Sequence, residues 1–112
     1  MTTKEFYDRH ISLLAEGNAD ALVDHDYRDD ATMILLVTNE PQYVHGKEAL
    51  KGMFKWYLEN IYRGFISTEK LALSEDSIFL EGTIDTANGP AKVYDAIYLK
   101  DGQIYRHYSG LK

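Results

Sequence analysis

Three side chains in this sequence have the chemistry needed for proton transfer. Asp95 and His107 interrupt the apolar rows of V-Y-D-A-I-Y-L-K-D-G-Q-I-Y-R-H-Y-S-G, residues 93–110, which reads as two strands joined by a tight turn. His10 stands in the apolar stripe of the first predicted helix, where a residue that only fills space is more often Leu. An acid and an imidazole that face one pocket can exchange a proton with a ligand carbonyl or enol. We therefore predict catalytic roles for Asp95, His107 and His10; the structural alternative is buried polar groups that satisfy one another.

Length and composition indicate one ordinary globular domain, residues 1–112. The chain has 112 residues, 45% of them hydrophobic, which is enough for one modest core. Its formal charge is −6 and it has no run of Lys or Arg, so we expect neither nucleic acid nor a membrane surface as a partner. Cysteine is absent, which excludes disulfides and thiolate chemistry and suits a reducing cytoplasm. The first residues lack the basic start and apolar run of a signal peptide, so we expect a cytoplasmic protein.

Hydrophobic periodicity predicts the elements that must position these side chains. Apolar residues recur at helical spacing in two long segments, and β-branched or alternating segments follow between turn residues. The predicted helices cover residues 3–16, 18–24 and 46–62, and the predicted strands cover residues 32–38, 65–74, 77–86, 91–100 and 103–111. This order predicts an α+β domain in which a curved antiparallel sheet holds the helices on one face.

The turn between the third and fourth predicted strands determines which side chains face the helices. A two-residue turn at Asn88-Gly89, residues that tolerate positive φ, places one mostly apolar set of residues on a common face. The members of this predicted inner face are Ile78, Leu80, Gly82, Ile84, Val93, Asp95, Ile97 and Leu99.

The last hairpin allows two registers, and a slip of one residue reverses every side chain. A two-residue turn at Asp101-Gly102 directs Arg106 and Tyr108 inward. A three-residue turn with a glycine bulge instead directs Tyr105, His107 and Ser109 inward and sets His107 opposite Asp95. We favour the bulge because it avoids burying Arg106 without a partner, and it leaves Ile104 pointing outward.

The outer face of the predicted sheet is rich in aromatic residues. That face carries Phe79, Glu81, Thr83, Tyr94, Tyr98, Arg106 and Tyr108. A monomer does not normally expose so many aromatics, so we expect a homodimer through this surface; the alternative is that the tyrosines simply cover the sheet.

Four motifs, in order, resemble the nuclear transport factor 2-like superfamily and, within it, the SnoaL-like and ketosteroid isomerase-like group. They are A-E-G-N-A-D (15–20), Y-R-D-D-A-T (27–32), V-H-G-K-E-A-L (44–50) and Y-D-A-I-Y-L-K-D-G-Q-I (94–104). Together they span almost the whole chain. The resemblance implies a cystatin-like fold: a cone-shaped α+β barrel, open at one end, whose curved antiparallel sheet wraps about three helices around a pocket.

Carried over residue by residue, the resemblance implies only part of the isomerase site. His10 and Asp95 fall where ketosteroid isomerase-like proteins carry the tyrosine and the protonated acid of their oxyanion hole. Leu35 occupies the position of their general base, so that base is absent. His107 matches the histidine that SnoaL-like cyclases carry on the final strand, but Ser109 and Gly110 supply no partner Asp. The Arg-Asp-Asp hydrolytic set of limonene epoxide hydrolase-like proteins is not visible.

These observations predict a pocket for a small apolar ligand, without cofactor or metal. No spacing of His, Asp or Glu matches a metal-ligand motif, and no phosphate-binding loop is present. The predicted ligand-contacting residues are Tyr27, Tyr57, Tyr105, Leu35, Phe54 and Ile97. Two classes of function remain: a cofactor-free enzyme that cyclises, isomerises or dehydrates a small apolar carbonyl compound, and a non-catalytic ligand-binding or dimerisation module of the same fold.

Overall fold

The computed structural model describes all residues from Met1 to Lys112 and contains three helices and six strands. In chain order the elements are α1 (Thr3–Glu16), α2 (Ala19–Asp26), β1 (Tyr27–Leu35), β2 (Gln42–His45), α3 (Lys47–Asn60), β3 (Tyr62–Leu73), β4 (Ser77–Thr86), β5 (Gly89–Lys100) and β6 (Gln103–Leu111). No helix has the length and apolar character that crossing a membrane requires.

Local signals fix the ends of the first two helices. The Thr2 hydroxyl accepts a hydrogen bond from the Glu5 backbone N–H, and the Glu5 carboxylate accepts one from the Thr2 N–H, which closes a capping box before α1. Gly17 ends α1 with a φ of 72°, in the left-handed region that glycine adopts readily. One residue later the Asn18 side chain caps α2. The chain therefore reverses within two residues and returns α2 alongside α1.

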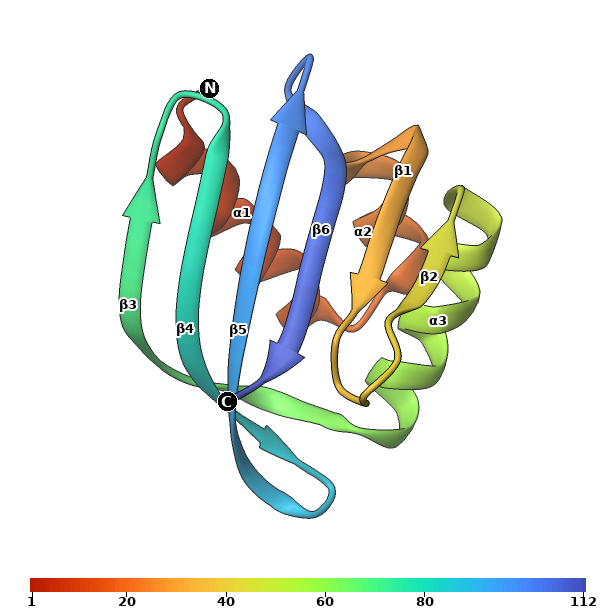
Figure 1. Cartoon of the computed structure of the whole chain (residues 1–112), viewed down its shortest axis with the longest axis vertical. Coiled ribbons are helices and arrows are strands. Elements are labelled where there is room, and N and C mark those ends of the chain that lie inside the picture. Colours follow the sequence, from red (N-terminus) through yellow and green to blue (C-terminus); the bar gives the residue numbers. More distant parts are fainter.

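The six strands form one curved sheet in the order β2-β1-β6-β5-β4-β3, and the helices lie together on one side of it (Figure 1). All neighbouring pairs are antiparallel except β1 and β6, which run parallel. The expectation of a wholly antiparallel sheet is therefore wrong at one pair. Turn residues in the sequence indicate antiparallel pairing only between strands that follow one another. The strand β1 instead pairs with β6, which lies far along the chain.

Two strand assignments near the N-terminal half also need correction. The first strand covers Tyr27–Leu35 rather than residues 32–38, because α2 passes directly into β1 at the junction of Asp26 and Tyr27. The charged segment Arg28-Asp29-Asp30 lacks the apolar residues by which a strand is predicted, so the start of β1 is not evident in the sequence. The strand β2 was not predicted, since its four residues form a short, mostly exposed edge.

The β4–β5 hairpin confirms the predicted inner face in spite of a different turn. Thr86 pairs with Gly89, so the turn residues are Ala87 and Asn88 instead of Asn88 and Gly89. The pairing register therefore differs by two positions, and an even slip keeps each side chain on its original face. Accordingly Ile78, Leu80, Ile84, Ile97 and Leu99 are all buried.

The β5–β6 hairpin combines features of both predicted registers. Its turn has two residues, Asp101 and Gly102, with φ values of 55° and 80°. Leu99 pairs with Ile104 but Tyr98 pairs with Arg106, so Tyr105 is an unpaired bulge residue.

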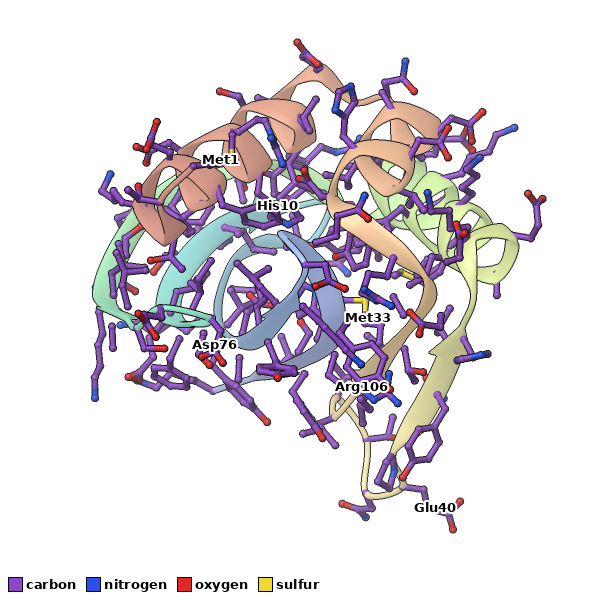
Figure 2. The ribbon with its side chains drawn as sticks, turned by 90° about the horizontal axis from the view of Figure 1, so that it is seen from above. Met1, His10, Met33, Glu40, Asp76 and Arg106 are labelled. Atoms are coloured by element: carbon purple, nitrogen blue, oxygen red, sulfur yellow. The ribbon has the colours of Figure 1, made fainter.

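This bulge allows residues on both sides of it to point inward. Ile104 is fully buried, so the expectation that it points outward is wrong. After the bulge the alternation is reset, and His107 is buried while Arg106 lies on the outer face, away from the helices (Figure 2). The residue directly opposite Asp95 is Ser109, not His107, which faces Ile97.

The hydrophobic core fills the space between the helices and the concave face of the sheet. Viewed from above, α1 and α2 cross this face and His10 points down between them and the strands (Figure 2). Large side chains seal the end near the α2–β1 junction: Tyr27, Phe6, Leu22, Leu50, Ile78 and Ile104 are each less than 2% exposed. The opposite end remains hollow and forms the site described below.

Replacing the fully buried Ile104 with alanine tests the bulge register. We expect Ile104→Ala to lower the free energy of unfolding by about 2–4 kcal/mol, because it removes buried methyl groups and leaves a cavity. The matched change Ile66→Ala, at an isoleucine that is 54% exposed on β3, should cost less than about 1 kcal/mol. Urea unfolding of both variants measures the difference, and equal small losses would place Ile104 on the outer face.

Candidate functional site

An internal cavity of about 430 Å³ opens between α1, α3 and the concave face of the sheet. Its walls are mostly apolar side chains of α3 and of the inner sheet face, among them Met53, Phe54, Leu80 and Ile97. The polar side chains that border it are few: His10, Gln42, Tyr57, Tyr62, Thr86, Asp95, His107 and Ser109. A predominantly apolar cavity with a few convergent polar groups is the usual form of a small-molecule site.

His107 is held by hydrogen bonds at both of its ring nitrogens. Nδ1 lies 2.8 Å from the Tyr27 hydroxyl, and Nε2 lies 2.7 Å from Oδ1 of Asp95. Tyr27 is completely buried, and Nδ1 is the sole hydrogen-bond partner of its hydroxyl. The Tyr27 O–H must therefore donate to Nδ1, because a buried O–H without an acceptor would be costly. That fixes the proton of neutral His107 on Nε2, which donates to Asp95.

Asp95 is an ionised acceptor at the wall of the cavity. Burial raises its pKa, but the hydrogen bond and charge of His107, together with the Ser109 hydroxyl opposite, outweigh burial and bring the pKa below its ordinary value. The side chain retains 19% of its exposure, and it borders the cavity. Asp95 is thus the member of the Tyr27–His107–Asp95 chain that a ligand can reach.

His10 forms a second oriented pair with Asp26. Its Nδ1 lies 2.8 Å from Oδ2 of Asp26, whose other oxygen accepts a 2.7 Å hydrogen bond from the Arg9 guanidinium. Asp26 is fully buried, and Arg9 balances its charge. Since a carboxylate only accepts, His10 Nδ1 donates to it, and in neutral His10 the lone pair is on Nε2.

Several polar atoms of the wall are open to the cavity. Among sealed side-chain polar atoms, Arg9 Nε is the one without a hydrogen-bond partner. His10 Nε2, Asp95 Oδ2 and the hydroxyls of Tyr57 and Tyr62 make no hydrogen bond to the protein either, so they are accessible from the cavity that their residues border. A ligand in the cavity can therefore meet an imidazole, a carboxylate, two phenols and the Ser109 hydroxyl beside Asp95.

The two tyrosines remain neutral over the physiological range. Burial, and then the negative charge of Asp95, raises the pKa of Tyr57, and burial followed by the nearby Tyr7 raises that of Tyr62. Their rings lie 5.7 Å apart between centroids. Both hydroxyls thus retain a proton that they can donate to a ligand oxygen.

The structure brings the three predicted catalytic residues together. The His10 and His107 rings lie 6.3 Å apart between centroids, and Asp95 binds His107 directly. The roles differ from the prediction, however. Both nitrogens of His107 are occupied, so His107 orients Asp95 rather than meeting a ligand itself.

Four of the six predicted ligand-contacting residues border the cavity, namely Tyr57, Leu35, Phe54 and Ile97. Tyr27 does not, because it is sealed in the core behind His107. Tyr105 does not either: as the bulge residue it lies on the outer face, where the Arg106 guanidinium carbon stacks 3.9 Å from its ring centroid. Neither residue therefore borders the cavity as predicted.

Sequence reasoning did not identify Asp26, Arg9 or Tyr62 as parts of the site. Asp26 and Arg9 are brought to His10 by the packing of α2 against α1, which leaves no pattern of spacing in the sequence. A usable signal was present for Asp26, an acid at the very end of an otherwise apolar helix face. Nowhere do three or more His, Asp or Glu side chains gather as metal ligands would.

The pKa of Asp95 predicts a pH dependence of stability. Because the folded pKa lies below the unfolded value of about 3.9, ionised Asp95 stabilises the fold fully above that pH, and this contribution is lost as the pH falls through the folded pKa. Urea unfolding below about pH 5 should therefore show a weaker pH dependence for Asp95→Asn than for the native protein. Asp85→Asn, on β4 and outside the cavity, should retain the native slope. Identical slopes in all three proteins would contradict the ionised pair.

Comparisons with known proteins identify the fold through structure alone. No protein-family model and no curated protein sequence matches the chain. A nuclear transport factor 2-like protein of unknown function from Mesorhizobium loti superimposes with a TM-score of 0.83 at 15% identity, covering 98% of this chain and 90% of that one. A second Mesorhizobium loti protein, described as a SnoaL-like polyketide cyclase, gives a TM-score of 0.74 at 24% identity and covers 97% and 98% of the two chains.

A third similar structure is SalBIII, an epoxide hydrolase/cyclase-like enzyme of pyran ring formation in the polyether salinomycin. It gives a TM-score of 0.80 at 16% identity and covers 97% of this chain and 89% of its own. At these identities the likeness establishes architecture and leaves activity open. The three helices, the curved six-stranded sheet and these superpositions together show that the chain has the cone-shaped α+β fold of nuclear transport factor 2-like proteins.

Proposed function

We propose that this protein binds a small, mostly apolar carbonyl compound in the internal cavity and performs acid–base chemistry on it without a cofactor. The observation that carries the proposal is the unbonded Nε2 of His10, which is open to the cavity while Nδ1 is held by the buried carboxylate of Asp26. An imidazole oriented by a buried carboxylate is a recurrent form of general base. Here it supplies the base that Leu35 cannot.

The reaction follows from the positions of these groups. His10 Nε2 removes a proton from carbon next to the ligand carbonyl, and Asp26 stabilises the imidazolium that forms. The hydroxyls of Tyr57 and Tyr62 donate to the oxygen of the resulting enolate. If the enolate is conjugated with a further double bond, the His10 proton returns to the far carbon and gives an isomer. If the neighbouring carbon carries a hydroxyl, the C–O bond breaks and the proton leaves with the hydroxyl as water. If the enolate carbon instead attacks a second carbonyl, a ring forms and the proton neutralises the resulting alkoxide.

Two of the structural neighbours support this class of reaction. One is described as a polyketide cyclase and another as a cyclase-like enzyme of pyran ring formation. Because the same architecture also serves without catalysis, the alternative is a ligand-binding module in which the His10–Asp26 pair only anchors a ligand.

Enolisation of β-tetralone, a bicyclic ketone, tests the proposal directly. In deuterated buffer near pH 8, where a free imidazole is neutral, the native protein should accelerate exchange of the hydrogens next to the carbonyl. His10→Ala and Asp26→Asn should each reduce this acceleration by about a hundredfold, since the base is removed or no longer oriented. Proton NMR of the ketone measures the exchange rate.

Three matched variants control this measurement. His45→Ala removes an exposed histidine that binds Thr32 outside the cavity, and should leave exchange unchanged. On β5, Ala91→Phe fills the cavity and should abolish exchange, whereas Ala96→Phe on the outer face should not. Saturable binding of β-tetralone without any exchange would refute the enzyme and favour the binding module.

We also propose a homodimer through the outer face of the sheet. Tyr98 and Tyr108 are 42% and 43% exposed there, beside a shallow apolar groove that includes Phe79 and Ala96. Neighbouring strands carry these aromatics side by side, and a second copy related by a two-fold axis would cover them with the same residues.

Equilibrium sedimentation at micromolar concentration should show a dimer for the native protein and a monomer for Tyr98→Glu/Tyr108→Glu. In this variant the two new carboxylates would be buried in the interface near the same carboxylates of the second copy. Their mutual repulsion and loss of hydration would destabilise the dimer. Asp85→Asn is the control that should remain dimeric. A native protein that sediments as a monomer would contradict the proposal.

A further inference from the structure

The polar end of the cavity presents hydrogen-bond acceptors where an oxyanion site would present donors. The Asp95 carboxylate and His10 Nε2 are the acceptors that face the cavity at this end, and the Ser109 hydroxyl opposite Asp95 directs its proton to that carboxylate. An ionised carboxylate can only accept, and a neutral imidazole whose proton is on Nδ1 accepts at Nε2. A ligand carbonyl, which also only accepts, is matched by neither of these two groups.

Buried hydrogen-bond partners, on the side away from the cavity, determine the protonation of Asp95 and His10. Tyr27 donates to His107 Nδ1, which places the His107 proton on Nε2 and directs it to Asp95. Protonating Nδ1 as well would leave the sealed Tyr27 hydroxyl without an acceptor. On the other side, the Asp26 carboxylate, already paired with Arg9, holds the His10 proton on Nδ1. His10 Nε2 can donate only if its buried ring becomes charged, and Asp95 can donate only if it takes up a proton, which the hydrogen bond from His107 opposes because it favours the charged carboxylate.

Donors are available elsewhere in the cavity. The hydroxyls of Tyr57 and Tyr62 border it from the α3–β3 junction and have no protein partner. A ligand that spans the cavity therefore meets donors at the tyrosines and acceptors at Asp95 and His10. The apolar walls between them suit a ring system.

We infer that the cavity selects ligands carrying a hydroxyl or amine N–H, which Asp95 accepts, on an apolar ring framework, and discriminates against ligands whose polar group there is a bare carbonyl. This inference rests on the proposed function and narrows its substrate class to hydroxylated carbonyl compounds. The carbonyl lies at the tyrosines and the hydroxyl lies at Asp95. In a dehydration, that hydroxyl leaves as water with the proton that His10 removed from the neighbouring carbon.

Two probes of similar size test the preference. β-Naphthol carries a donor, whereas β-naphthaldehyde carries only an acceptor. Isothermal titration near pH 8 should give the native protein at least about tenfold higher affinity for the naphthol, because the aldehyde leaves a desolvated carboxylate oxygen without a hydrogen bond.

Asp95→Asn provides the decisive comparison, because an amide of the same shape can also donate. The preference should fall to within about threefold or invert, mainly through tighter binding of the aldehyde. The control Asp85→Asn makes the same charge change outside the cavity and should keep the native preference.

The outcomes separate this inference from the proposed function. Equal affinity of the native protein for the two probes, or a preference that survives Asp95→Asn, overturns the donor selection and leaves the cavity a ligand site. Binding that survives Ala91→Phe, or no binding of either probe, overturns both.

Discussion

The arrangement of the site depends on one constraint: a phenolic O–H sealed in the core must have an acceptor. Tyr27 has lost all contact with solvent, and its hydroxyl has a single hydrogen-bond partner, Nδ1 of His107. From this bond follow the tautomer of His107, the direction of its second hydrogen bond and the acceptor character of Asp95. The chemistry of the cavity surface is thus decided by a residue that no ligand touches.

The same constraint explains why the α2–β1 junction is built without a loop. Asp26 is the last residue of α2 and Tyr27 the first of β1. Consecutive residues in a helix-to-strand junction point in different directions, so Asp26 reaches His10 on α1 while Tyr27 reaches His107 on β6. An inserted residue at this point would rotate one of the two side chains away from its histidine. Two neighbouring positions in the chain therefore orient both imidazoles.

The sequence predicted those parts of the structure that depend on neighbours along the chain. The ends of α1, the strand β4 and the inner face shared by Leu80 and Asp95 followed from caps, turns and alternation. The grouping of His10, Asp95 and His107 also followed, because the inner face and the α1 stripe both point to the core. What could not be predicted depends on non-local packing. No turn in the sequence indicates the parallel pairing of β1 with β6. The Arg9–Asp26 contact depends on how α1 and α2 pack against each other.

The bulge at Tyr105 explains why the predicted register of the last hairpin placed His107 correctly but Ile104 and Tyr105 on the wrong faces. A bulge can follow a two-residue turn at any of several positions, and the side chains before and after it then obey opposite alternations. Its place here is set by tertiary packing: Ile104 fills the core and Tyr105 stacks between cationic side chains outside. Neither preference is visible in the alternation of the strand itself.

The parallel pairing of β1 with β6 has a consequence for how the protein folds. Tyr27 and His107 are separated by 80 positions, so their hydrogen bond closes a long loop of the chain. The antiparallel strands β3 to β6 are joined by short turns and can form early, whereas the contact that closes the chain carries a large entropic cost and forms late. During synthesis, β6 leaves the ribosome after the other strands of the sheet. Until then the buried Tyr27 hydroxyl has no acceptor, and the cavity acquires its polar end in the final step of folding.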